Sequence, residues 1–117
     1  MKAVVPNLMR LTALAVCLTV FSGLAPAQSG AVSSPGEKLF NAKCTMCHGP
    51  DGAGKTMMGE KLKATDLRSE EVQKQTNAQL TEVITNGKAK MPAFKGKLTP
   101  EQVGQLVIEI RDLGKSR

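Results

Sequence analysis

The sequence of 117 residues contains no Tyr, no Trp, three Phe and a single His. A chain of this length has room for one domain, which excludes a multidomain enzyme. Its net charge of +6 is compatible with nucleic-acid binding. However, the aromatic side chains that such proteins use to stack bases are missing. The composition therefore favours a small domain whose basic surface meets an acidic protein or a membrane surface.

The first 27 residues are typical of an export signal. Lys2 and Arg10 supply positive charge, residues 11–24 are mostly apolar, and Ala25-Pro26-Ala27 has the small-x-small form of a cleavage site. The apolar stretch covers 14 residues, fewer than the roughly 20 that a membrane-spanning helix needs. We therefore expect cleavage after Ala27 and a periplasmic location. The alternative is a chain tethered to the membrane by an uncleaved N-terminus.

The remaining 90 residues are expected to form a flexible leader, residues 28–34, and one folded domain, residues 35–117. The leader is rich in Ser, Gly and Ala. Without Lys2 and Arg10 the chain keeps 14 basic and 10 acidic side chains, a net charge of +4.

Cys44 and Cys47 are the only thiols after residue 27, and His48 follows them directly in the motif C-x-x-C-H. A Cys pair in an exported protein can form a disulfide, and C-x-x-C is also found in thiol redox proteins and zinc sites. A Cys/His zinc site cannot be completed here, because the sequence has no second His and no second Cys pair. No strand-helix-strand pattern surrounds the motif as a thiol oxidoreductase would require.

The motif has the spacing of covalent haem attachment. Residues 44, 47 and 48 fall within one helical turn and can face one haem together. Cys44 and Cys47 would form thioether bonds with the haem vinyl groups, and His48 would bind the iron.

With a single His in the chain, the second axial ligand is sought among the methionines. Met46 lies inside the attachment motif and cannot cross to the far face of the haem. Met57 and Met58 follow His48 closely, and we expect them to pack at the haem edge. Met91 lies 43 residues after His48, and Pro92 favours an extended backbone there. We expect Met91 to be the distal ligand.

Four helices are predicted, and no strand pattern is visible. Three begin at the capping-box patterns of Ser34, Thr76 and Thr99, and a short one follows Ser69 around residues 70–74. We expect them to end near Lys43, at about residue 74, at Gly87 and at Gly114. The last helix carries an apolar stripe that comprises Val103, Leu106, Val107, Ile110 and Leu113.

Three segments, residues 44–52, 87–94 and 106–114, together resemble a small monohaem class I cytochrome c of the bacterial, c6-like kind. The resemblance implies an all-α cytochrome c fold, with about four short helices wrapped around one covalently attached haem c. It also implies that the first helix, through Gly36 and Phe40, crosses the last near Leu106, Val107 and Ile110. Residues 35–117 would be the cytochrome c domain.

Two positions depart from the family pattern. The last helix has Glu109 where such cytochromes often carry an aromatic residue. In many members a Gly-Pro pair after the motif supplies the carbonyl that accepts a hydrogen bond from the proximal His, whereas here Gly59 is followed by Glu60. The sequence therefore does not identify the carbonyl partner of His48.

With His48 and Met91 both on the iron, no vacant site remains for oxygen or peroxide. We therefore expect a soluble shuttle of single electrons and not an enzyme. The alternative is a haem protein with an open or labile distal site that binds gases or reacts with peroxide.

The expected partners are redox proteins with acidic docking patches, such as a membrane reductase, oxidase or dehydrogenase. Lys88, Lys90, Lys95 and Lys97 lie in the segment around Met91 without an acidic residue, and we expect them to steer such a partner. No nucleic-acid partner is expected, and the chain is expected to be a monomer.

Overall fold

The computed structural model describes residues 30–116, which form a mostly helical domain. Its six helices are α1 (Pro35–Lys43), α2 (Thr45–His48), α3 (Met57–Leu62), α4 (Glu70–Gln73), α5 (Asn77–Asn86) and α6 (Pro100–Lys115). Within these residues extended pairing is limited to two isolated bridges, Lys88 with Met91 and Lys95 with Leu98. The predicted all-α class is confirmed. The expected signal peptide, residues 1–27, lies outside the described residues, as do residues 28–29 of the expected leader.

The four predicted helices begin at their expected caps. The hydroxyls of Ser34, Ser69, Thr76 and Thr99 each accept a hydrogen bond from a backbone N–H in the first helical turn. Thr76 and Thr99 form complete capping boxes with Gln79 and Gln102. Ser34 forms only half of one, because it accepts from the N–H of Glu37 without a reciprocal side-chain bond.

The prediction of about four helices was too low, because α2 and α3 were not recognised as separate elements. Helix α2 is one turn long and α3 has six residues, too few for an apolar repeat to be visible in the sequence. Tertiary contacts position α3 against α2. The Thr56 hydroxyl donates to the carbonyl of Met46 at 2.7 Å, and a Cβ on Gly59 would collide with the carbonyl oxygen of Cys47.

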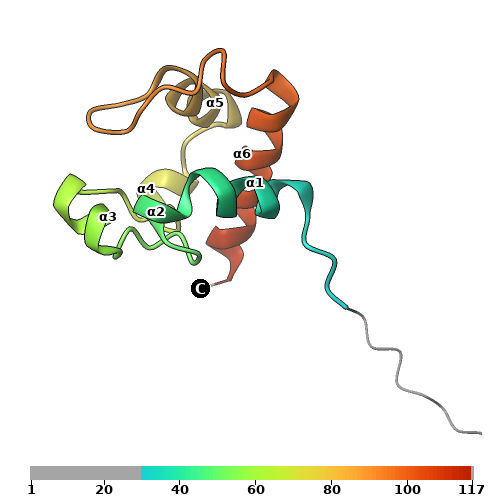
Figure 1. Cartoon of the computed structure of the whole chain (residues 1–117), viewed down its shortest axis with the longest axis horizontal. Helices are drawn as coiled ribbons and strands as arrows, with labels where there is room; N and C mark the ends of the chain where they lie inside the picture. The colour runs from blue at the N-terminus through green and yellow to red at the C-terminus, as the bar shows by residue number, and fades with distance from the viewer. Residues whose placement is uncertain (1–29, 117) are drawn as a thin grey trace, which may run out of the picture. The chain divides into compact units, whose positions relative to one another are not determined.

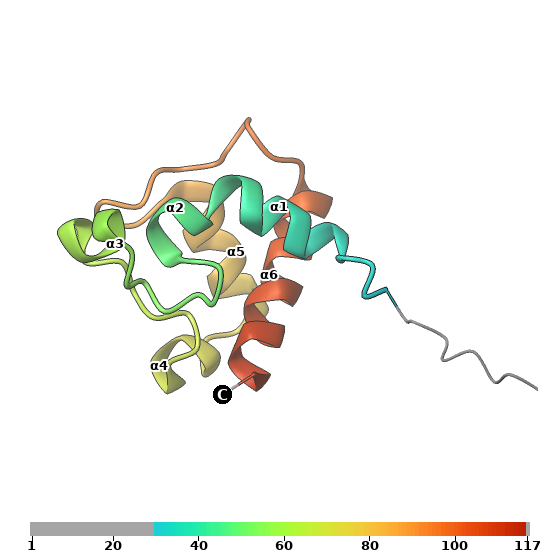
Figure 2. The same cartoon turned by 60° about the horizontal axis from the view of Figure 1, so that its bottom comes forward.

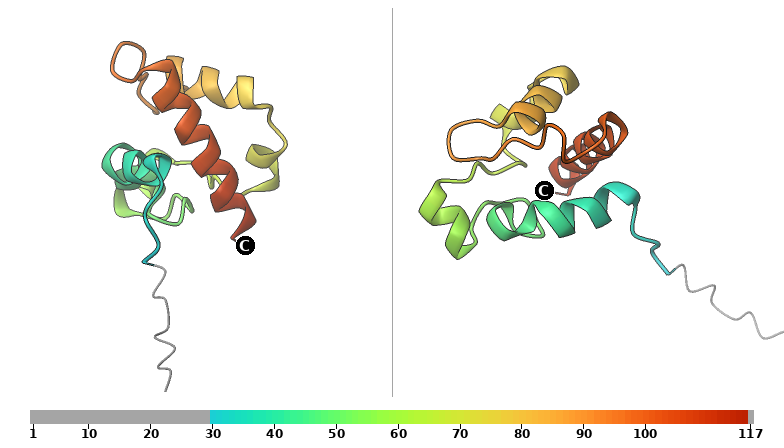
Figure 3. Two further views of the ribbon diagram at one scale, coloured as in Figure 1. Left: turned by 90° about the vertical axis from the view of Figure 1, so that its right-hand side faces the viewer. Right: turned by 45° about the horizontal axis from the view of Figure 1, so that its top comes forward.

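The core includes the crossing of α1 and α6, which the family resemblance implied. Phe40 and Leu106 are each only 1% exposed, and a Cβ on Gly36 would collide with the carbonyl oxygen of Gln105. Figures 1 and 3 show α1 running across α6. Helix α6 has no aromatic residue, and its buried side chains are the aliphatic residues Val103, Leu106, Val107 and Ile110.

Helix α5 packs on α6, and the loop between them, residues 87–99, extends to the side of the domain that carries α3 (Figure 2). Helix α6 continues through Gly114 to Lys115, one residue further than predicted. Within residues 30–116, none of the helices combines the length and the apolar character that crossing a membrane requires.

Candidate functional site

Cys44, Cys47 and His48 lie together at the junction of α1 and α2. Cys44 is the residue between the two helices, and its carbonyl accepts hydrogen bonds from the N–H groups of Cys47 at 3.2 Å and of His48 at 2.9 Å. These two bonds fold the segment into one helical turn, as the spacing predicted. Gly49 follows with φ of 75°, a left-handed conformation that ends the turn and that residues with a Cβ rarely adopt.

The His48 ring has an identified partner. Its Nδ1 atom lies 3.1 Å from the carbonyl oxygen of Thr65. A carbonyl can only accept, so Nδ1 donates its proton and the neutral ring keeps the lone pair of Nε2 free. Burial lowers the pKa of His48, and the bond to Thr65 acts in the opposite direction. The ring is therefore held as a neutral base with one nitrogen available to bind a metal.

The sequence left the carbonyl partner of His48 open, because the Gly-Pro pair of the family pattern is absent at Gly59 and Glu60. Thr65 supplies it from the loop between α3 and α4. Thr65 is exposed and belongs to no sequence pattern, so no signal in the sequence identified it.

Met91 lies in the loop between α5 and α6, in a tight turn with Lys88. The N–H of Met91 donates to the carbonyl of Lys88 at 2.9 Å, and the N–H of Lys88 donates to the carbonyl of Met91 at 3.3 Å. Gly87 precedes this turn, and a Cβ there would lie 2.7 Å from the carbonyl oxygen of Met91. The close approach of these backbones fixes where the Met91 side chain begins.

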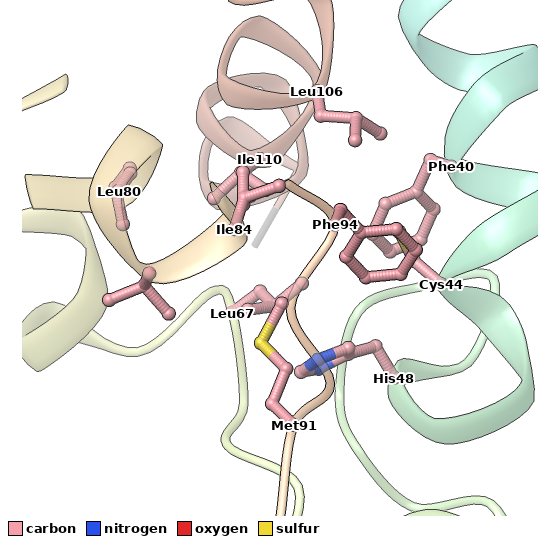
Figure 4. A pocket seen from close by; sticks show the side chains of 11 residues that line it. Phe40, Cys44, His48, Leu67, Leu80, Ile84, Met91, Phe94, Leu106 and Ile110 are labelled. Atoms are coloured by element: carbon pink, nitrogen blue, oxygen red, sulfur yellow. The ribbon is translucent and has the colours of Figure 1, made fainter. Parts of the chain in front are cut away.

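His48 and Met91 reach into the same interior space from different elements, α2 and the loop, as Figure 4 shows. Two adjoining cavities share Cys44, His48, Met91 and Phe94 as lining residues. The inner cavity has a volume of about 50 Å³, and its other walls are entirely apolar: Phe40, Leu67, Leu80, Val83, Ile84, Leu106 and Ile110. The outer cavity measures about 440 Å³.

The other methionines differ in their relation to these cavities. Met46 and Met58 line the outer cavity, with exposed fractions of 72% and 39%. Met57 is 89% exposed and lines neither cavity. Packing around the cavity therefore fits Met58 but not Met57. Met91 alone among them also lines the inner cavity.

All charged side chains that line the outer cavity are lysines: Lys43, Lys63, Lys88 and Lys90. We call these four residues the lysine rim. Lys95 and Lys97, which the sequence analysis grouped with Lys88 and Lys90, do not line this cavity. Lys43 and Lys63 were missed, because they come from the ends of α1 and α3 and not from the basic segment around Met91.

Comparisons with known proteins identify the family of this chain. A family model described as "Cytochrome C oxidase, cbb3-type, subunit III" matches residues 31–108. Cytochrome c6 of Nostoc sp. strain PCC 7120 is 36% identical over 106 residues, which is 91% of this chain and 90% of the relative. Cytochrome c6 of Leptolyngbya boryana is 35% identical over 80 residues, 68% of this chain and 91% of the relative. This chain belongs to the c-type cytochromes.

A larger relative and a solved structure agree with this assignment. The "Cbb3-type cytochrome c oxidase subunit FixP" of Bradyrhizobium diazoefficiens is 35% identical over 95 residues, 80% of this chain but only 31% of that protein. The solved structure of "KustC0563 c-type cytochrome" has 40% sequence identity and a TM-score of 0.62, and the match covers 67% of this chain and 95% of that one. The cytochrome therefore has the c6-like family and fold that its motifs indicated.

As a c-type cytochrome the protein carries covalently attached haem c and works in electron transfer, not as an enzyme. The cavities fit such a group. The apolar inner walls suit a macrocycle, the free Nε2 of His48 suits iron, and the thiols of Cys44 and Cys47 lie at the wall of the outer cavity.

The thiols of the cytochrome do not resemble those of a thiol redox protein. Cys44 and Cys47 are half-buried and free of a disulfide. Burial, and to a smaller extent the neighbouring Cys47, raises the pKa of Cys44 to about 11. Thiol oxidoreductases depend on the opposite shift, which yields a thiolate near neutral pH. The raised pKa of Cys44 therefore argues against a reactive redox thiol at this position.

Proposed function

We propose that this cytochrome carries single electrons on one haem c that is attached through Cys44 and Cys47 and ligated by His48 and Met91. The observation that carries the proposal is the convergence of His48 and Met91 on a cavity whose remaining inner walls are apolar. When bound, the haem supplies one-electron exchange between ferric and ferrous iron.

The residues of the chain have separate parts in this function. Cys44 and Cys47 hold the group permanently, so that it is not lost during transfer between partners. His48 offers a nitrogen whose orientation the Thr65 carbonyl sets. Met91 offers a soft thioether that favours ferrous iron and raises the potential relative to a bis-His site. With both ligands present, oxygen and peroxide have no free position on the iron.

The ligand set is tested on the purified holoprotein by intact mass, visible spectrum and redox titration. We expect the mass of one covalent haem and a ferric charge-transfer band from a Met ligand. Met91→Ala should keep the haem, abolish this band, permit binding of carbon monoxide and lower the potential. Met58→Ala, a matched change in the wall of the outer cavity, should do none of these. The reverse pattern, or a high-spin wild type, would contradict the assignment.

We further propose that the mature protein begins at Gln28 and is a soluble periplasmic monomer whose residues 35–117 form the cytochrome c domain. The charged, apolar and small-residue pattern of residues 1–27 supports this. Expression of the whole chain, followed by fractionation and N-terminal sequencing of the haem-bearing form, tests it. A product in the membrane fraction with an intact N-terminus would favour the tethered alternative.

The lysine rim is proposed as the docking surface for redox partners with acidic patches, such as a membrane reductase, oxidase or dehydrogenase. Lys43, Lys63, Lys88 and Lys90 line the outer cavity together with Cys47 and Met91, and we expect the haem edge to reach solvent on this side. Complementary charge raises association rates by about 10-fold to 1,000-fold at low salt, and weak docking suits a carrier that must leave quickly.

Charge reversal on the rim tests this docking. We expect Lys90→Glu to slow electron transfer from the native donor at low ionic strength, with the difference shrinking as salt is added. Lys115→Glu, the same change at the C-terminal end of α6, should have a much smaller effect. Stopped-flow rates that are equal for both variants at every salt concentration would show that the rim only solubilises the protein.

A further inference from the structure

His48 lies within a frame of hydrogen bonds that extends beyond its direct partner. Its carbonyl accepts from the N–H of Gly54 at 2.8 Å, and its Nδ1 atom donates to the Thr65 carbonyl at 3.1 Å. Leu67 lies two residues after Thr65, and its N–H donates to the carbonyl of Gly52 at 2.8 Å. Residues 65–67, whose Thr65 carbonyl accepts the hydrogen bond from His48, are thus bound on one side to the loop that follows α2.

The other side of this segment is held by Gln73, the last residue of α4. The side-chain amide nitrogen of Gln73 donates to the carbonyl of Leu67 at 2.7 Å and to the carbonyl of Ile110 at 3.0 Å. Both N–H bonds of one amide are therefore used, and they link residues 65–67 to the longest helix, α6. Gly114 leaves the space for this amide, because a Cβ there would collide with it.

The backbone of Gln73 is also fixed. The guanidinium of Arg111 donates from Nη1 to the Gln73 carbonyl at 2.9 Å and from Nη2 to Oδ1 of Asn77 at 2.9 Å. Arg111 also lies in α6. The side chain and the main chain of Gln73 are thus both hydrogen-bonded to α6. We call the hydrogen-bonded link from Leu67 through Gln73 to α6 the Gln73 strut.

Arg68 makes two ion pairs at this segment. Arg68 pairs with Asp66 at 3.1 Å, a contact within the segment itself. Its second carboxylate, Asp51, is 3.8 Å away with 62% of its side chain exposed, and exposed ion pairs contribute little. Gln73 connects the segment to α6 through Leu67 and Ile110.

We propose that Gln73 is a positioning residue for the redox centre, which holds the Thr65 carbonyl on Nδ1 of His48 through Leu67. The inference rests on the proposed function, since it requires His48 to bind the iron. A proton held firmly by an acceptor makes an imidazole ligand more basic and stabilises the ferric state. Removing the Gln73 hydrogen bonds should weaken the bond between His48 Nδ1 and the Thr65 carbonyl and raise the reduction potential.

The test compares two identical changes in the holoprotein. Gln73→Leu removes both donors, whereas Gln102→Leu removes a glutamine contact with the backbone of Thr99 at the start of α6. Both should destabilise the fold modestly. Only Gln73→Leu should shift the ferric–ferrous equilibrium, by about threefold to tenfold, which is about 30–60 mV at 59 mV per tenfold for one electron. It should also speed the exchange of the His48 Nδ1 proton with solvent, measured by NMR of the ferrous protein.

A shift of less than twofold relative to Gln102→Leu, with unchanged proton exchange, would overturn the proposal. If Gln73→Leu yields no holoprotein, Gly114→Ala decides, because its Cβ displaces the Gln73 amide without deleting it. An upward shift of the potential supports the strut, and an unchanged potential and exchange rate refute it. The Met charge-transfer band of the wild type reports the ligand set separately, so the loss of that assignment would be recognised independently.

Discussion

Ala89 has a strained backbone in the turn that presents Met91. Its φ is 53°, in the left-handed region that is unfavourable for residues with a Cβ. The hydrogen bonds between Lys88 and Met91 close the turn around it. Ala89 therefore keeps this conformation while the turn is closed, and we expect displacement of Met91 from the haem iron to open the turn and relieve the strain.

The cost of this conformation is about 1–2 kcal/mol for a residue with a Cβ. Glycine would avoid it but would lose about 0.4–1 kcal/mol through the greater freedom of the unfolded chain. Ala89→Gly should consequently stabilise the holoprotein by about 1 kcal/mol, which corresponds to a rise in Tm of about 4–8 °C for a domain of this size. The same gain should make Met91 about fivefold harder to displace from iron by added imidazole.

Ala93→Gly is the matched control in the same loop. Ala93 is exposed and is not among the described residues with positive φ, so glycine there brings only its entropic cost. Thermal unfolding, monitored through the haem absorption, measures the change in Tm. Titration of the ferric protein with imidazole measures how readily Met91 is displaced. An Ala89→Gly variant that melts below the wild type and binds imidazole as readily would refute the claim of strain in the ligand loop.

Three further predictions concern the crossing of α1 and α6 and the haem. Gly36→Ala should cost about 1–3 kcal/mol in denaturant unfolding, because its Cβ meets the backbone of Gln105, whereas Gly104→Ala, with open space around it, should be neutral or stabilising. Desolvation, and to a smaller extent the charges of Glu37 and Asp112, raises the pKa of Glu109. The charged form of Glu109 therefore opposes folding, and Glu109→Gln should melt above the wild type at pH 7. The difference in Tm should vanish as the pH falls below about 4, where Glu109 is protonated in the folded and the unfolded state. A larger difference in acid would contradict this. Protein made without haem should lack cooperative melting and most of its helicity by circular dichroism, because Phe40 and Phe94 are the only aromatic residues among residues 30–116.

The features that sequence predicted correctly are those that a few neighbouring residues determine. Each of the four predicted helix starts has a hydroxyl cap that accepts from the N–H three residues ahead, at Ser34, Ser69, Thr76 and Thr99. Each start is therefore determined by four consecutive residues. The stripe of α6 is local in the same sense, since its helical spacing needs only the α6 sequence. The single turn that brings Cys44, Cys47 and His48 together follows from their spacing.

The features that sequence missed depend on distant segments. The Thr65 carbonyl is a backbone atom that every residue possesses, and only the tertiary fold brings this one to His48. Helix α3 begins at Thr56, whose hydroxyl is shared between its own cap and the carbonyl of Met46. The lysine rim combines residues from α1, α3 and the loop, so no run of charge in the sequence reveals its full membership.

The position of Met91 was predictable although the residue lies far from His48 in sequence, and the reason is physical. The loop after Met91 is bound to the end of α5, where the N–H groups of Phe94 and Lys95 donate to the carbonyls of Ile84 and Thr85 at 3.1 and 2.9 Å. These carbonyls would otherwise lack partners at the helix end. The Thr76 cap sets where α5 begins and Gly87 sets where it ends. The local sequence signals that bound α5 therefore also fix where the loop that carries Met91 begins. No comparable series of local signals leads to Thr65. This is why the placement of Met91 beside the same cavity as His48 was predictable from the sequence, whereas the carbonyl that pairs with His48 was not.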